Sequence, residues 1–244
     1  MIRLIIVGIV LVLILILSYI LFFVEWIVGK FSKKAKDNSY LRFARWGSRL
    51  ILMLSGVKVT VIGKENIQDE AALYVGNHRS IFDILVMYTQ CKTPTGFVAK
   101  DSLEKIPSLR VWMRSLNCLF LDRQDIKKGM QMILQAIDYV KQGISIAIFP
   151  EGTRNTGEEL SLLPFKEGSF KIALKAGCPI VPVAINNSAE VFESHFPKIK
   201  KTHVVIEYGK PIYPKDLSRD EQKVIGATCQ GIIQETIRKN AELV

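Results

Sequence analysis

The chain has 244 residues, 49% of them hydrophobic, which is enough for one α/β domain and an additional element. Its formal net charge is +10, and residues 1–56 carry eight basic but only two acidic side chains. A nucleic-acid-binding protein would spread basic and aromatic residues over its folded body, and the sequence lacks that pattern. The four cysteines are isolated, without metal-ligand spacing, which excludes a cysteine-rich metal site and favours reduced thiols.

An apolar run opens the chain. Residues 4–24 are 21 residues without a charge, and as a helix they would span about 31 Å, the hydrocarbon thickness of a bilayer. A secretory signal has a shorter apolar region that ends at small residues, whereas Glu25 and Trp26 follow here. We therefore expect a retained membrane segment, and the basic residues after it predict that the body faces the anionic cytoplasmic headgroups.

Residues 38–55 show a second helical pattern. Its apolar residues recur at helical spacing: Phe43, Trp46, Leu50, Met53 and Leu54. Another face carries a basic stripe of Arg42, Arg45 and Arg49. Such a helix is typical of a membrane interface, and the alternative is a domain helix that packs on the core. We expect residues 1–56 to form a membrane anchor and residues 57–244 to form the α/β domain.

The body alternates short β-rich runs with helical patterns. Strands are predicted at 57–62, 71–75, 95–99, 118–122, 144–149, 179–185 and 203–208. Helices are predicted near 81–90, 108–116, 125–141, 166–176 and 218–240, the last capped by Ser218. This alternation predicts an α/β fold: a mixed, mostly parallel sheet of about seven strands flanked by helices, preceded by the membrane-associated segment. The first two strands are too close for a crossover helix, so we expect them to form a hairpin.

The first candidate site follows the strand predicted at 71–75. His78 lies where this strand enters a loop, and Asp83 follows five positions later. A regular helix carrying both residues would hold their side chains about 140° apart. If Ser80 instead caps a helix that begins at Ile81, Asp83 folds back toward the imidazole and the two form a general base. The alternative is a structural histidine beside a capping box of Ser80 and Asp83.

A second candidate site follows the strand predicted at 144–149. Pro150 ends this strand because it has no N–H, and Gly152 permits a tight turn or close approach to a ligand. Thr153 and Arg154 offer a hydroxyl group and a forked cation, which together suit a phosphate. The alternative is a plain surface turn with a solvated arginine.

The two loops are expected to meet at one edge of the sheet. Ligands of open α/β sheets bind beyond the carboxyl ends of the strands, and the loops of His78 and Glu151 both leave such ends. Arg123 directly follows the strand predicted at 118–122 and adds another cation. A base with two arginines suits an anionic substrate that carries a hydroxyl group to be activated. Residues 143–147 resemble a nucleophile elbow only superficially, because they lie inside a predicted strand.

In combination these residues resemble the glycerolipid acyltransferase family, of the 1-acylglycerol-3-phosphate acyltransferase type. The similarity covers about residues 70–190 and rests on four blocks, of which the first matches the family's His-x4-Asp motif. The blocks are Asn77-His78-x4-Asp83, Lys100 to Arg123, Phe149 to Arg154 followed by Pro164-Phe165-Lys166-x-Gly168, and Cys178 to Val183. The second block departs from the family pattern at Ser102, where an acidic residue is common, and at Arg110 and Asn117, where glycines are common.

The resemblance implies transfer of a fatty acyl group from a thioester, acyl-CoA or an acyl carrier protein, to the sn-2 hydroxyl of 1-acylglycerol 3-phosphate, giving phosphatidic acid. His78 would be the base, and Asp83 would orient and support it. The residues implied in binding the phosphate and glycerol are Arg123, Glu151, Gly152, Thr153 and Arg154. Backbone N–H groups near His78 are candidates for stabilising the oxyanion. No cofactor or metal ion is implied.

Two alternatives remain open. One is an acyltransferase with another acceptor, such as glycerol 3-phosphate or another lysolipid, and the other is a non-catalytic membrane lipid-binding protein on the same fold. The pair of His78 and Asp83 favours catalysis, because binding alone needs no base. The expected partners are the lysophospholipid, the thioester donor and anionic membrane lipids. The expected location is the cell membrane, with the catalytic domain on its cytoplasmic side.

Overall fold

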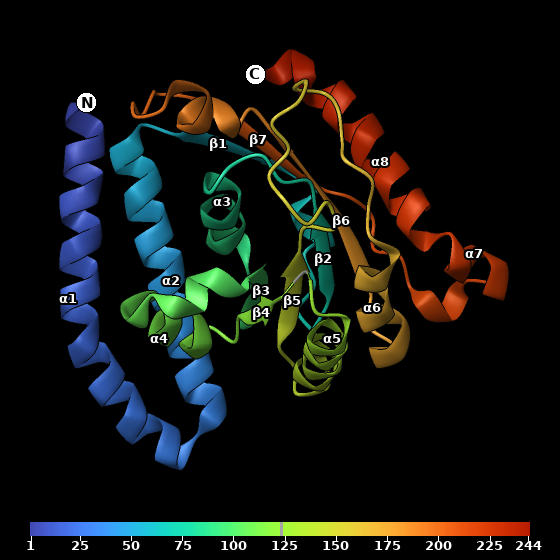
Figure 1. Cartoon of the computed structure of the whole chain (residues 1–244), viewed down its shortest axis with the longest axis horizontal. Helices are drawn as coiled ribbons and strands as arrows, with labels where there is room; N and C mark the ends of the chain where they lie inside the picture. Colours follow the sequence, from blue (N-terminus) through green and yellow to red (C-terminus); the bar gives the residue numbers. More distant parts are fainter. Residues whose placement is uncertain (123) are drawn as a thin grey trace.

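A seven-stranded sheet forms the centre of the computed structural model, which describes residues 1–122 and 124–244 (Figure 1). The strands are β1 Lys58–Ile62, β2 Leu73–Gly76, β3 Thr95–Lys100, β4 Leu119–Leu121, β5 Ser145–Ile148, β6 Ile180–Asn186 and β7 His203–Tyr208. Their order is β1-β7-β6-β2-β5-β3-β4, and every neighbouring pair is parallel except β6 and β7. The predicted mixed, mostly parallel sheet is therefore confirmed.

The sheet is mixed for a different reason from the one predicted. The expected hairpin of β1 and β2 is wrong, because β7 and β6 lie between these two strands. β7 is almost wholly buried along Val204–Ile206 and needs a partner on each side, and it pairs with β1 in parallel and with β6 in antiparallel orientation. β1 is left at the edge, as its partly exposed side chains show.

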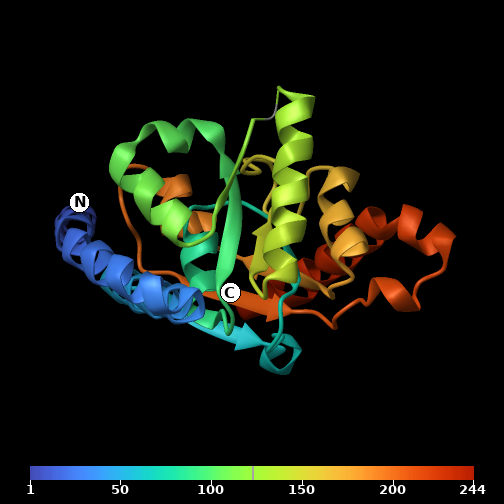
Figure 2. The same cartoon turned by 90° about the horizontal axis from the view of Figure 1, so that it is seen from below.

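Helices cover both faces of the sheet (Figures 1 and 2). They are α1 Ile2–Phe31, α2 Lys33–Ser55, α3 Phe82–Gln90, α4 Pro107–Ser115, α5 Ile126–Lys141, α6 Lys171–Ala176, α7 Arg219–Lys223 and α8 Ile225–Asn240. Side chains of a strand alternate between faces, so Tyr74 joins the core under α2 and α3, while Leu73 and Val75 join the core under α5, α6 and α8. Both faces of β2 are thereby buried, and β2 lies at the centre of the sheet.

Local signals placed most boundaries correctly. Every predicted strand is present within two residues of its predicted limits. The last predicted helix is divided at Val224 into α7 and α8, and Ser218 caps α7 in a capping box with Glu221. The helix predicted at 166–176 begins as a 3₁₀ turn at Glu167–Phe170 before α6.

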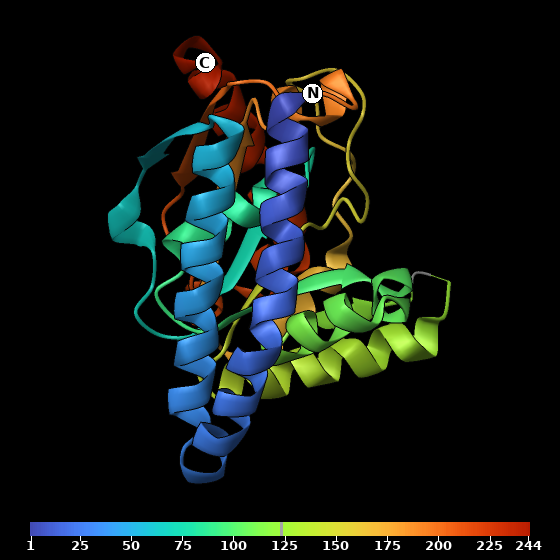
Figure 3. The same cartoon turned by 90° about the vertical axis from the view of Figure 1, so that its left-hand side faces the viewer.

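α1 and α2 lie side by side along one flank of the body (Figure 3). α1 has 30 residues and is long and apolar enough to cross a membrane, and most of its large apolar side chains are exposed. Its polar residues Ser18 and Glu25 are instead buried. The indole Nε1 of Trp112 in α4 donates a hydrogen bond of 2.9 Å to Ser18 Oγ. The polar stripe of α1 therefore faces the protein, and its apolar surface faces outward.

α2 contacts both α1 and α3. Its buried side includes Leu41, Ile51 and Leu52, which join the core beneath α3. Trp46 and Met53, two members of the predicted apolar face, are 53% and 66% exposed. α2 therefore packs on the core with one side and presents apolar and basic residues on another, and contact of that outer side with a membrane stays a prediction.

Candidate active site

His78 and Asp83 meet at the carboxyl end of the central strand β2. His78 lies in the loop that follows β2, and Asp83 is in the first turn of α3. The distance from His78 Nδ1 to Asp83 Oδ2 is 2.8 Å. α3 begins at Phe82, one residue later than expected, and the chain folds back between the two residues as the sequence argument required.

The imidazole is held in one orientation. An ionised carboxylate only accepts hydrogen bonds, so His78 Nδ1 donates to Asp83 and the lone pair lies on Nε2. Among the described residues, none forms a hydrogen bond with Nε2, and the His78 side chain is 17% exposed. Phe149 stacks on the imidazole with a centroid distance of 4.2 Å and an interplanar angle of 9°. The ring is thus fixed, with one basic nitrogen available to a substrate.

Asp83 also organises the main chain of the loop. It is fully buried, and its Oδ2 accepts hydrogen bonds of 2.8 Å from the N–H groups of Arg79 and Ser80. Ser80 Oγ accepts from the N–H of Phe82. Of the expected capping box, the hydrogen bond from the Ser80 N–H to Asp83 is present, but Ile81 occupies the N-cap and Ser80 Oγ accepts from Phe82 instead of Asp83. The same carboxylate supports the start of α3 and orients the imidazole.

Glu151 lies behind the His78 loop. Its side chain is buried, with Oε1 accepting from the N–H of His78 at 2.8 Å and Oε2 from the N–H of Leu163 at 2.9 Å. Burial raises the pKa of the Glu151 carboxyl group above its ordinary 4.5, and the two main-chain hydrogen bonds oppose this shift. The N–H of Asn155 donates to the carbonyl of His78 at 2.7 Å. The loop at 150–155 therefore holds the main chain of His78 from both sides.

The remaining residues of this loop turn outward. Gly152 has φ +74°, a left-handed conformation that favours glycine, and a Cβ there would lie 2.8 Å from Lys166 Nζ. Thr153 and Arg154 are exposed. Arg154 Nη1 donates a hydrogen bond of 3.0 Å to Glu193 Oε1. Of the predicted site residues, Arg123 lies outside the described residues, Asp83 lies in the first turn of α3, and the others lie in the loops after β2 and β5.

Two residues of the site were not predicted from the sequence. Arg79 is buried and donates to the carbonyls of Gly157 and Glu158. It therefore joins the His78 loop to the segment that follows the 150–155 loop. Its position inside the His-x4-Asp motif was the available signal. Glu193 lies in a short 3₁₀ turn after β6, and no local pattern marks it.

Four of the candidate oxyanion donors near His78 already have acceptors within the protein. The N–H of His78 donates to Glu151, those of Arg79 and Ser80 donate to Asp83, and that of Ile81 donates to Glu193. These N–H groups hold the loop in shape and are already engaged. Stabilisation of an oxyanion by main-chain N–H groups near His78 stays a prediction.

One departure from the family pattern keeps the backbone shape. Asn117, at a position where glycine is common, has φ +57°. Asparagine is among the few residues that adopt this left-handed conformation readily. The main chain of Asn117 also approaches Gly96 of β3 so closely that a Cβ there would lie 2.0 Å from the Asn117 carbonyl oxygen. Asn117 thus adopts, in the turn before β4, a left-handed conformation that glycine also favours.

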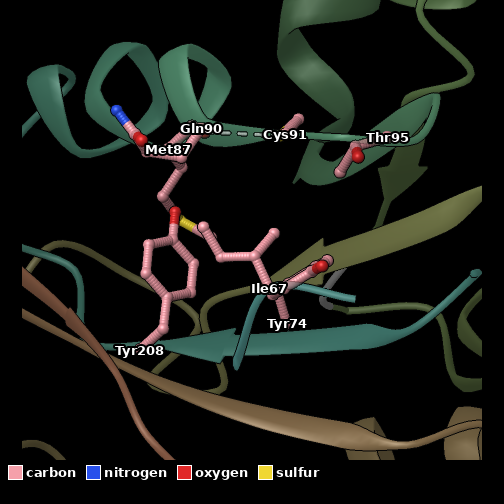
Figure 4. Close-up of a pocket in the computed structure, with 7 residues that line it drawn as sticks. All are labelled: Ile67, Tyr74, Met87, Gln90, Cys91, Thr95 and Tyr208. Carbon is pink, nitrogen blue, oxygen red and sulfur yellow. Dashed lines mark hydrogen bonds between the residues drawn. The ribbon is translucent and has the colours of Figure 1, made fainter. Parts of the chain in front are cut away.

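A small pocket lies between α3 and the sheet, and His78 is not among its lining residues (Figure 4). Its lining residues are Ile67, Tyr74, Met87, Gln90, Cys91, Thr95 and Tyr208. Its volume is about 10 Å³, the space of roughly one water molecule. This cavity is therefore too small for a lipid chain, and the loops around His78 form the candidate site.

Comparison with known proteins gives consistent matches. The family model described as Acyltransferase matches residues 58–186. The 1-acyl-sn-glycerol-3-phosphate acyltransferase of Haemophilus influenzae is 32% identical over 196 residues, which cover 80% of this chain and 80% of that protein. The protein of the same name from Borreliella burgdorferi is 36% identical over 145 residues, which cover 59% of this chain.

The fold also matches a solved structure. The crystal structure of the 1-acyl-sn-glycerophosphate acyltransferase from Thermotoga maritima superposes with a TM-score of 0.75, covering 98% of this chain and 96% of that one at 24% identity. The aligned part spans 57% of the Borreliella protein and 59% of a similarly named protein of Saccharomyces cerevisiae. The family match covers most of the sheet and both candidate loops.

Proposed function

The chain belongs to the acyltransferase family, and from this premise we propose that it transfers a fatty acyl group from a thioester to the sn-2 hydroxyl of 1-acylglycerol 3-phosphate, giving phosphatidic acid. The observation that carries the proposal is the fixed imidazole of His78, with Asp83 on Nδ1 and an available Nε2. Relatives that carry the name of this activity support the choice of reaction.

In the proposed mechanism His78 is the general base. Its Nε2 takes the proton of the acceptor hydroxyl as that oxygen attacks the thioester carbonyl. The positive charge that forms on the imidazole lies 2.8 Å from the buried carboxylate of Asp83, which stabilises it. The imidazolium then gives its proton to the departing thiolate as the tetrahedral intermediate collapses. No covalent acyl-enzyme is required.

We assign acceptor binding to the outward part of the 150–155 loop. Gly152, Thr153 and Arg154 present a tight turn, a hydroxyl group and a guanidinium on the surface beside the His78 loop. Arg123 is proposed as a second phosphate ligand from its place after β4 in the sequence. Glu151 has both oxygens on main-chain N–H groups, so we assign it to holding His78 in place.

The membrane is the proposed location. The exposed apolar surface of α1 is consistent with membrane association. The basic residues of α2 suit anionic headgroups. From the excess of basic residues after α1 we propose that the body lies on the cytoplasmic side of the cell membrane. Both the lysophospholipid and the product reside in the bilayer, so a membrane-bound enzyme meets its acceptor there.

The test is acyl transfer by purified protein in detergent. The acceptors are 1-acylglycerol 3-phosphate, glycerol 3-phosphate and a lysolipid without a terminal phosphate, each offered with acyl-CoA and with an acyl carrier protein thioester. We expect turnover with 1-acylglycerol 3-phosphate and its loss in His78→Ala. Turnover with another acceptor alone would assign a different acyltransferase activity, and binding without turnover would indicate a lipid-binding protein.

A further inference from the structure

Glu193 joins two parts of the site that lie far apart in the sequence. It begins the 3₁₀ turn Glu193–His195 in the connection from β6 to β7. Its Oε1 accepts from Arg154 Nη1 at 3.0 Å and from the N–H of Ile81 at 2.9 Å. Its Oε2 accepts from Ser80 Oγ at 2.5 Å. One carboxylate thus binds both the start of α3 and the exposed arginine of the 150–155 loop.

We propose that Glu193 is a positioning residue that holds the Arg154 guanidinium ready for the acceptor phosphate. This inference rests on the proposed function, because it takes Arg154 as the phosphate ligand. The Arg154 side chain is 53% exposed, whereas that of Glu193 is only 21% exposed. The arginine is therefore the mobile partner, and Glu193 is the fixed one.

Fixing the arginine beforehand favours binding. A long exposed side chain loses rotamer freedom when it binds a ligand, and a side chain that is already held loses less. Among the residues that the structure describes, Glu193 is the hydrogen-bond partner of Arg154, and it engages Nη1. A guanidinium has five N–H donors, so those on Nη2 and Nε remain for two oxygens of a phosphate.

The negative charge of Glu193 does not cancel this advantage. Its oxygens face the N–H of Ile81, the hydroxyl of Ser80 and the positive end of the nine-residue helix α3. Together with Arg154, these groups offset most of the charge, so little repulsion of a bound phosphate remains. Orientation is therefore the larger effect.

The arrangement also ties phosphate binding to the catalytic pair. Ser80 donates its N–H to Asp83, which accepts from His78. Glu193 accepts a hydrogen bond from the Ser80 hydroxyl group. Arg154 and His78 are therefore both positioned relative to the start of α3. A phosphate placed by Arg154 is then placed relative to the base.

The experiment is a double-mutant cycle with Glu193→Ala and Arg154→Ala, measured as the KM for 1-acylglycerol 3-phosphate and for the thioester. We expect Glu193→Ala to raise the acceptor KM about fivefold, which is the effect expected from losing a half-exposed ion pair. The KM for the thioester should not change. In the Arg154→Ala background the same change should have less than about a twofold effect. Glu193→Gln, which retains an acceptor oxygen, should lie between wild type and Glu193→Ala.

Glu190→Ala is the matched control. Glu190 lies in the same connection and pairs with His195 at 2.8 Å, and among the described residues it forms no hydrogen bond with α3 or Arg154. It should leave the acceptor KM unchanged. Melting temperatures separate folding defects from binding defects, and Glu193→Gln keeps the test informative if Glu193→Ala is unstable.

Independent effects would overturn the inference. If the fold-changes of Glu193→Ala and Arg154→Ala multiply, or if both substrates are affected equally, Glu193 only supports the start of α3. Failure of the proposed function has a different signature: the wild-type protein, with Glu193 intact, would not acylate 1-acylglycerol 3-phosphate. The two failures are therefore distinguishable.

Discussion

Replacing Glu151 by glutamine tests whether the 150–155 loop holds His78 or contacts the substrate. The carboxylate accepts one hydrogen bond on each oxygen, from the N–H groups of His78 and Leu163. Glutamine retains one acceptor oxygen and turns an NH₂ group toward the other N–H. A buried N–H without an acceptor costs about 1–3 kcal/mol.

The neutral amide is less costly to bury than the carboxylate, which offsets part of this loss. We expect a net loss of about 1–2 kcal/mol, which lowers the melting temperature by about 2–8 °C in a chain of this size. A shift of about 1 Å in a catalytic group can lower the rate up to about 100-fold, so kcat should fall about 10- to 100-fold. The KM for the acceptor should change little, because the contact is to the main chain of His78.

The assay combines thermal unfolding in detergent with initial rates over a series of acceptor concentrations. Glu158→Gln is the control, because Glu158 is exposed in the segment after the loop and its side chain makes no hydrogen bond to the described residues. The reasoning is refuted if Glu151→Gln leaves the melting temperature and kcat unchanged and raises only the acceptor KM. That result would place Glu151 in contact with the substrate.

The stability difference between wild type and Glu151→Gln should also depend on pH. Burial raises the pKa of Glu151 above 4.5, so the folded state holds this proton to a higher pH than the unfolded chain. Its contribution to stability is fully present below pH 4.5 and is lost as pH rises through the raised pKa. As the pH rises through the raised pKa of Glu151, the free energy of unfolding of the wild type should therefore fall relative to that of Glu151→Gln. Urea unfolding of both proteins across the pH range measures these free energies. A difference between them that does not change with pH would contradict a raised pKa for Glu151.

Further predictions follow from the other site residues. His78→Ala should lower kcat about 10²- to 10⁴-fold in a protein that still folds, and a folded variant with more than about a tenth of wild-type kcat would exclude the base role. Asp83→Asn should lower both activity and stability, by about 2–4 kcal/mol in urea unfolding, because Oδ2 accepts three N–H groups. Arg154→Ala should raise the acceptor KM far more than the thioester KM, and equal changes would indicate a structural role. Deletion of residues 1–28 should leave vesicle flotation that weakens with salt, whereas no flotation at any salt would limit membrane contact to α1.

Much of the fold could be predicted because its signals are local. Most strands are short runs of β-branched and other apolar residues bounded by turn residues, and β6 (Ile180–Asn186) shows this pattern. The pairing of His78 with Asp83 could also be predicted, because only five positions separate them. A loop that leads into a helix is enough to turn Asp83 back toward His78. The placement of both candidate loops at strand carboxyl ends followed from the predicted parallel sheet.

The sequence alone therefore determined which segments are strands and helices, the apolar N-terminal helix and the two loops of the candidate site. Tertiary structure decided that β7 separates β1 from β2, that Glu151 binds the main chain of His78 across 73 positions, and that Glu193 meets Arg154 across 39. The physical reason is that strand and helix signals arise from side-chain periodicity and turn chemistry within a few residues. Contacts between distant segments depend instead on which packing of the whole chain buries both faces of the sheet and gives each buried polar group a partner.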